Sequence, residues 1–283
     1  MTRIAYVNGE YSPLEDAKIS ILDRGFLFAD GVYEVAAVLD GKLADYAGHV
    51  ARLHRSLGEL QIAPPVGDDE LLEIHRELVK RNAVDEGLVY LQVTRGAGER
   101  DFPFPKDAKP SLVLFTQAKN LAEAPIAATG YKVKTVPDIR WARRDIKSVA
   151  LLAQVLAKQA AADSGCNEAW MVEDGKVTEG GSSNAYIIKD GRIITRPVSN
   201  KILSGITRAS VLKLAAERDM EVEERVFSVD EALAADEAFV TAASTFVMPV
   251  VEIDGKMIGG GQPGPVARRL REIYIDHARS SAI

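Results

Sequence analysis

The chain has 283 residues, of which 47% are hydrophobic and 27% are charged, and this suits a globular protein of two domains or one large one. Its net charge of −6 argues against a nucleic-acid partner, because binding to phosphates requires a basic surface. The single cysteine excludes an intrachain disulfide framework and favours a cytoplasmic location, and the four dispersed histidines offer no metal site. The sequence contains no run of about 18 apolar residues, so we predict no membrane span, and the first residues do not resemble a signal peptide.

The first half of the chain is predicted to combine short strands with two amphipathic helices. Asn8-Gly9 is typical of a tight hairpin turn, and Val50, Leu53 and Leu57 form one helical stripe. We predict strands at 3–7, 17–22, 32–38, 87–94 and 111–116, one helix beginning at His49, and another over 69–82. Alternation in the third strand places Tyr33 and Val35 on the face opposite Val32.

The second half begins after a polar stretch, 117–128, that contains Pro125 and lacks regular periodicity. We therefore predict a small N-terminal α/β domain over 1–118, a linker over 119–127 and a larger C-terminal domain over 128–283. The expected elements of the second domain are strands at 131–136, 168–172 and 185–188, and helices over 151–162, 209–217 and 265–279.

One lysine is a candidate nucleophile. Lys147 follows Arg140, Arg143 and Arg144 and precedes the expected helix 151–162. An amine held among cations and partly desolvated loses its proton more readily, as formation of a Schiff base requires. The alternative is a solvated lysine beside a helix cap.

Four further features suit an anionic aromatic ligand, although each has an ordinary structural explanation. Arg52 lies next to the apolar helix stripe and needs either a salt bridge or a bound phosphate. Glu179 precedes a Gly/Ser loop, where carboxylates more often make local turn bonds. The Gly205 turn before a helix forms an anion cup or a plain N-terminus capped by Thr207. The loop with Arg95 and Arg100 faces a substrate or is merely solvated.

Together, the lysine, the carboxylate, the arginine and the helix N-terminus suit pyridoxal 5′-phosphate. The chain resembles the fold-type IV pyridoxal-phosphate-dependent aminotransferases, most closely the D-amino-acid transaminases among them. The segments that carry this resemblance are 28–35 (FADGVYEV), 49–53 (HVARL), 92–96 (QVTRG), 144–148 (RDIKS), 179–184 (EGGSSN) and 203–208 (LSGITR).

The resemblance implies a two-domain α/β (α+β) fold with the cofactor in the cleft between the domains. Lys147 would bind the cofactor as a Schiff base and move the Cα proton, and Glu179 would hold the pyridine nitrogen protonated. Arg52 and the start of the helix would bind the phosphate. The implied cofactor-binding residues are Arg52, Arg140, Glu179, Ser182, Leu203, Ile206, Thr207, Ala243 and Ser244. Arg140 is expected near the phenolic oxygen, Leu203 on the ring face and Ser182 in support of the ring.

Tyr33, Val35, Arg100 and Phe102 are the expected substrate residues, with Tyr33 and Arg100 on the α-carboxylate. Two positions depart from the family. Phe102 stands where the D-amino-acid enzymes typically have histidine, and Ala243 stands where threonine is common, which leaves Ser244 or backbone amides for the phosphate.

We therefore expect a homodimeric transaminase that moves amino groups between D-amino acids, such as D-alanine or D-glutamate, and 2-oxo acids. The alternatives are a branched-chain L-amino-acid transaminase, an (R)-amine transaminase, an aminodeoxychorismate-type lyase, and a non-enzymatic binding protein that keeps the fold.

Overall fold

The computed structural model describes residues 2–283, which form two compact units. Unit 1 contains the chain up to Asn120 together with Ile146–Ala150 and Ala278–Ile283. Unit 2 contains Leu121–Asp145 and Leu151–His277. The domain boundaries expected from the sequence stay a prediction. The structure adds that two short segments of the second half of the chain pack with unit 1.

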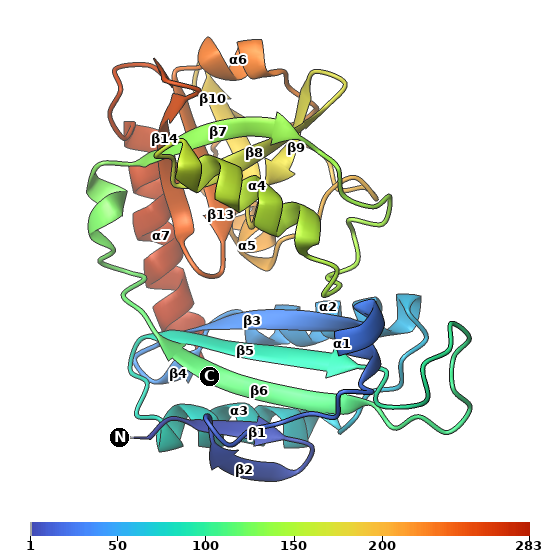
Figure 1. Cartoon of the computed structure of the whole chain (residues 1–283). Helices are drawn as coiled ribbons and strands as arrows, with labels where there is room; N and C mark the ends of the chain where they lie inside the picture. The colour runs from blue at the N-terminus through green and yellow to red at the C-terminus, as the bar shows by residue number, and fades with distance from the viewer. Residues whose placement is uncertain (1) are drawn as a thin grey trace. The chain divides into compact units, whose positions relative to one another are not determined.

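Unit 1 is an antiparallel sheet with two helices on one face (Figure 1). The strand order is β2-β1-β6-β5-β3-β4. Helix α2 packs on β3, and helix α3 packs on β1 and β6. The elements are β1 Ile4–Val7, β2 Glu10–Pro13, α1 Arg24–Phe28, β3 Gly31–Leu39, β4 Lys42–Leu43, α2 Tyr46–Glu59, α3 Asp68–Arg81, β5 Gly87–Thr94 and β6 Ser111–Ala118.

The two faces of this sheet differ, as the alternation along β3 predicts. Val32 and Ala36 are buried in the core beneath the helices. On the opposite face the rings of Tyr33 and Tyr90 stack at 5.7 Å, and Tyr90 stacks on Phe115 at 4.8 Å. The open face of the sheet therefore carries a row of half-buried aromatic rings.

The sequence predictions for unit 1 are confirmed with two corrections. The strand predicted at 17–22 is wrong: the segment has no strand partner, and Ile19 and Ile21 are exposed. Apolar alternation alone does not form a strand when no neighbouring backbone is available for pairing. Helix α2 begins at Tyr46, three residues before the predicted start, after Asp45 in a left-handed conformation.

Unit 2 is built on a nine-stranded mixed sheet (Figure 1). The order is β12-β11-β10-β13-β14-β7-β8-β9, with β15 paired to β14. The pairs β7–β8, β7–β14 and β11–β12 are parallel. The elements are η1 Pro125–Ala128, β7 Tyr131–Pro137, α4 Leu152–Asp163, β8 Glu168–Glu173, β9 Lys176–Gly180, β10 Asn184–Lys189, β11 Arg192–Thr195, α5 Ile206–Ala216, β12 Val222–Glu224, α6 Val229–Leu233, β13 Glu237–Ala242, β14 Phe246–Ile253, β15 Lys256–Met257 and α7 Pro265–Ser281, whose last residues count with unit 1.

Helix α7 is capped from a neighbouring strand. Glu237 of β13 accepts hydrogen bonds from the backbone N–H groups of Val266 and Ala267 at 3.0 and 2.9 Å. A carboxylate at this place satisfies two of the unpaired donors of the helix and complements its dipole. The mixed α/β (α+β) class predicted from the sequence is confirmed.

Candidate active site

Lys147 lies on the edge of β3. The N–H of Tyr33 donates to the carbonyl of Lys147 at 3.0 Å, and Val149 N–H donates to Gly31 at 3.0 Å. The Nζ of Lys147 is 4.1 Å from the centre of the Tyr33 ring. The sequence placed this lysine before a helix over 151–162, and α4 indeed begins after it, at Leu152. Backbone pairing with β3, which sequence periodicity does not reveal, fixes its position.

The arginines that precede the lysine are compensated by carboxylates. Arg140 contacts Asp138 and Glu179, and Arg143 contacts Asp145 at 3.0 Å. The cations near Lys147 that the sequence indicated are therefore accompanied by acidic side chains.

Arg52 is buried and engaged by a second buried residue. Its Nε and Nη2 each donate to the carboxylate of Glu34 at 2.7 Å, and His49 Nδ1 lies 2.8 Å from the same carboxylate. Burial by itself would raise the pKa of Glu34, but the charge and hydrogen bonds of Arg52 and His49 lower it to about 2. The salt bridge left open by the sequence is present. A glutamate on the core-facing side of β3 was the signal that could have indicated it.

Arg100 and Phe102 lie in an exposed loop after β5. The guanidinium carbon of Arg100 is 5.4 Å from the centre of the Phe28 ring and 5.9 Å from that of Phe102. Buried Arg24 holds this loop by donating to the carbonyls of Asp101 at 2.6 Å and Phe102 at 3.2 Å. Phe102 thus contributes an aromatic ring beside Arg100, at the position where this sequence departs from the histidine that is usual in the family.

Within unit 2, Glu179 at the end of β9 is buried and multiply bonded. Its carboxylate accepts from Arg140 Nη1 at 2.5 Å, from Asn184 Nδ2 at 2.9 Å and from the Leu203 backbone N–H at 3.1 Å. Burial raises the pKa of Glu179, while Arg140 and the Leu203 N–H oppose that shift. Glu179 therefore makes more hydrogen bonds than the local turn bonds that a carboxylate before a Gly/Ser loop usually makes.

Ser182 is bonded to a buried acid that the sequence did not single out. Its hydroxyl donates to Glu168 Oε2 at 3.2 Å, and the hydroxyl of Ser183 donates to the same oxygen at 3.0 Å. Lys158 lies 3.1 Å from the other oxygen of Glu168. The Gly/Ser loop is therefore anchored to β8 through its hydroxyl groups.

The N-terminus of α5 has no side-chain cap. Ile206 and Thr207 open the helix after Gly205, which makes no capping bond. Backbone N–H groups in a first helical turn have no acceptor within the helix and favour an anion. A Cβ on Gly205 would lie 2.1 Å from Asn184 Oδ1, so only glycine allows this close approach. Asn184 therefore links the α5 N-terminus to Glu179.

Ala243 and Ser244 lie in the turn between β13 and β14, and Leu203 precedes α5 with its side chain half-buried. Helix α5 packs on β13. Unit 2 thus gathers the carboxylate, the uncapped helix and this turn, whereas Lys147, Tyr33, Val35, Arg52, Arg100 and Phe102 belong to unit 1.

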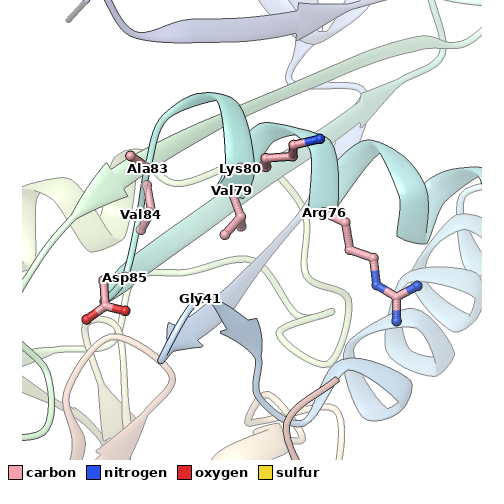
Figure 2. A pocket seen from close by; sticks show the side chains of 7 residues that line it. All are labelled: Gly41, Arg76, Val79, Lys80, Ala83, Val84 and Asp85. Atoms are coloured by element: carbon pink, nitrogen blue, oxygen red, sulfur yellow. The ribbon is translucent and has the colours of Figure 1, made fainter.

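Other features of the described residues do not suggest a different site. No group of three or more metal-ligating side chains occurs within residues 2–283, and no helix in that range is long and apolar enough to span a bilayer. A pocket of about 320 Å³ in unit 1 is lined by Gly41, Arg76, Val79, Lys80, Ala83, Val84 and Asp85 (Figure 2). It contains none of the predicted site residues, and charges of both signs line it.

The residues present fit pyridoxal phosphate in their chemistry. The amine of Lys147 matches the aldehyde, and the buried carboxylate of Glu179, which has a remaining acceptor position, matches the ring nitrogen. The uncapped N-terminus of α5 matches the phosphate.

Comparison with known proteins agrees with this chemistry. The amino-transferase class IV family matches residues 31–253. D-alanine aminotransferase of Staphylococcus haemolyticus is 41% identical over 99% of both chains, and that of Bacillus licheniformis is 40% identical over 93% of both. Among solved structures, the T.th. branched-chain amino acid aminotransferase with pyridoxamine 5′-phosphate has a TM-score of 0.91 at 26% identity, and the match covers 99% of this chain and 95% of that one. The chain therefore belongs to the amino-transferase class IV family, the fold-type IV aminotransferases.

Proposed function

We propose that this protein transfers amino groups between D-amino acids of the D-alanine or D-glutamate type and 2-oxo acids, with pyridoxal 5′-phosphate as cofactor. The observation that carries the proposal is the agreement of relatives named D-alanine aminotransferase, at 40–41% identity over nearly the whole chain. The fit of the site residues to the cofactor supports it independently.

When bound, the cofactor supplies an aldehyde that captures amines and a ring that accepts the electrons of a broken Cα–H bond. Lys147 Nζ would hold the cofactor, and the same amine would take up and give back the proton at the substrate Cα. Tyr33 keeps this amine at the edge of β3 through the ring contact and the backbone bond.

Glu179 would bind the ring nitrogen with its remaining acceptor position, and Leu203 and Ser182 would support the ring. The N–H groups of Ile206 and Thr207 and the turn at Ala243 and Ser244 would hold the cofactor phosphate. Arg52 adds a cation whose orientation is fixed by Glu34.

Tyr33, Val35, Arg100 and Phe102 bind the substrate. Tyr33 and Val35 share the open face of the sheet of unit 1. Arg100 binds the α-carboxylate, and Phe102 makes its surroundings less polar than a histidine would.

The branched-chain L-amino-acid transaminase stays the second candidate, because solved structures of that name share this fold at TM-scores up to 0.91. Turnover of D-alanine, L-leucine and (R)-1-phenylethylamine with 2-oxoglutarate separates the candidates. We expect D-alanine to react fastest, and activity on L-leucine alone would contradict the proposal. Release of pyruvate without an amino acceptor would indicate a lyase.

Two variants test the chemistry directly. K147A should lose the visible absorption of the bound cofactor and all transamination while keeping its melting temperature. K189A, which replaces an exposed lysine at the end of β10, serves as the matched control. Borohydride reduction followed by peptide mass spectrometry should place the cofactor on Lys147, and its attachment elsewhere would refute this assignment.

We also propose a cytoplasmic homodimer. Helix α4 exposes Leu152, Val155 and Leu156, at 73%, 58% and 53%, on one helical face. Apolar side chains gathered on one face are typical of surfaces that another protein covers. Light scattering should give twice the 30.7 kDa chain mass, and L152D/V155D should lower it. A monomer at micromolar concentration would contradict the dimer. The single cysteine supports the cytoplasm as location.

A further inference from the structure

A chain of alternating charges in unit 2 leads from the surface to Glu179. Lys201 Nζ lies 2.5 Å from Glu173, and Glu173 lies 2.7 Å from Arg144. Arg144 Nη1 is 3.2 Å from Asp138, which is 2.7 Å from Arg140 Nη2. Arg140 Nη1 then reaches Glu179 at 2.5 Å. Each inner charge of this series, from Glu173 to Arg140, lies between two charges of the opposite sign.

Burial increases along the series. The side chain of Lys201 is 51% exposed, that of Arg140 is 6% exposed and that of Asp138 is fully enclosed. Charges interact more strongly where solvent is excluded, and an unpaired buried charge is costly. The inner members therefore depend on one another, whereas the outermost lysine is largely screened by water.

Asp138 is the residue that fixes Arg140. Its Oδ1 accepts from Arg140 Nε at 3.0 Å, and its Oδ2 accepts from Arg140 Nη2 at 2.7 Å. The hydroxyl of Thr178 also donates to Oδ2 at 2.6 Å. This two-point contact leaves Arg140 Nη1 aimed at Glu179.

The carboxylate of Glu179 has room for one further donor. Oε1 accepts from Arg140 and the Leu203 N–H, and Oε2 accepts from Asn184 and the same N–H. Each carboxylate oxygen offers about two acceptor positions, and the Leu203 N–H is shared between the two oxygens. Arg140 contributes the only formal positive charge among these partners.

We propose that Arg140, fixed by Asp138, is a positioning residue that holds Glu179 charged and oriented toward the ring nitrogen of the cofactor. This inference rests on the proposed function, in which Glu179 binds that nitrogen. It gives Arg140 a role that differs from contact with the phenolic oxygen. A cation beside the carboxylate favours a carboxylate anion facing a protonated ring nitrogen over the neutral pair of carboxylic acid and free nitrogen.

The series itself supplies the controls. Single substitutions R140M, R144M and K201M remove successive cations at increasing separation from Glu179, and E179Q marks complete loss of the carboxylate charge. R140K keeps the charge but loses the two-point contact with Asp138. For each purified apoprotein, pyridoxal phosphate affinity is measured by titration, and the protonation of the ring nitrogen is measured with ¹⁵N-labelled cofactor by NMR. Circular dichroism melts establish that each variant is folded.

R140M should weaken cofactor binding by at least about tenfold, the effect of one lost charge-assisted hydrogen bond, and should shift the ¹⁵N signal toward that of unprotonated nitrogen. R144M should show a smaller effect in both measurements, and K201M should match the wild type within about twofold. If R140M does not fold, R140K takes its place, and its ¹⁵N signal must shift in the same direction, toward unprotonated nitrogen, but by a smaller amount.

One outcome would overturn this inference: R140M, or R140K in its place, has the same cofactor affinity and the same ¹⁵N signal as K201M, while E179Q still differs from the wild type. If E179Q also matches the wild type, Glu179 does not act on the ring nitrogen and the inference fails with it. Failure of the wild type to bind pyridoxal phosphate would instead refute the proposed function, which makes the two failures distinguishable.

Discussion

The carboxylate of Glu34 and the guanidinium of Arg52 face each other through two hydrogen bonds of 2.7 Å, both side chains being at most 8% exposed. Removal of one partner from such a buried pair leaves an uncompensated charge. We expect E34Q to lower the free energy of unfolding by about 3–5 kcal/mol, measured by urea denaturation of the apoprotein. E59Q, which alters an exposed glutamate of the same helix as Arg52, should change it by less than about 1 kcal/mol. A wild-type value for E34Q would show that the pair does not stabilise unit 1.

The same carboxylate predicts a pH dependence of stability. Arg52 and His49 hold the pKa of Glu34 at about 2, below its ordinary value of 4.5. The stabilisation is therefore fully present above pH 4.5 and is lost as the pH falls toward 2. It amounts to roughly 3 kcal/mol for a shift of this size. Urea titrations between pH 6 and pH 2.5 should show a shallower decline for E34Q than for the wild type, and parallel curves would contradict the assignment.

Gly205 is expected to tolerate no side chain. In G205A the new Cβ would displace Asn184, whose amide bonds both Glu179 and the Leu203 carbonyl. We expect cofactor affinity to fall by about tenfold, because one hydrogen bond to a charged group is lost. G58A is the contrasting control. Gly58 lies within helix α2 with nothing near its Cβ position, so alanine there should stabilise the protein by about 0.5–1 kcal/mol. Unchanged affinity in G205A would show that Asn184 does not organise this site.

Arg100 should discriminate between carboxylate and neutral substrates. R100M is expected to raise the KM for D-alanine by about one to two orders of magnitude, the effect of one charge-assisted contact. The KM for (R)-1-phenylethylamine should change far less, because that amine has no carboxylate. Steady-state kinetics with both donors measures the difference. An equal rise for the two substrates would remove Arg100 from the carboxylate site.

Arg24 should control the order of the loop that carries Arg100. Its guanidinium donates to the carbonyls of Asp101 and Phe102 and pairs with Asp30 at 2.8 Å. In R24Q the loop loses its charged anchor, so trypsin should cleave after Arg100 faster than in the wild type, by about tenfold for a lost charged hydrogen bond. R3Q, at the start of the chain, is the control. Identical cleavage rates would show that other contacts order the loop.

The sequence by itself determined the local elements and the chemistry of this protein. Asn8-Gly9 sets a hairpin because both residues adopt positive φ, and Ser228 forms a capping box with Glu231, three residues later in the chain. Lys147, Glu179 and the Gly205 turn are predicted site features because their residue types suit one cofactor and because the surrounding segments resemble a family that the comparisons confirm.

Only the tertiary structure decided which groups contact one another. The pairing of Lys147 with Tyr33 and of Glu34 with Arg52 joins residues 114 and 18 positions apart, and no periodicity reports such contacts. Local preference also failed at 17–22, where alternating apolar residues found no strand to pair with. The physical reason is that a strand, a buried ion pair and an oriented carboxylate each take their stability from partners that lie far away in the chain, whereas turns and caps take theirs from adjacent residues.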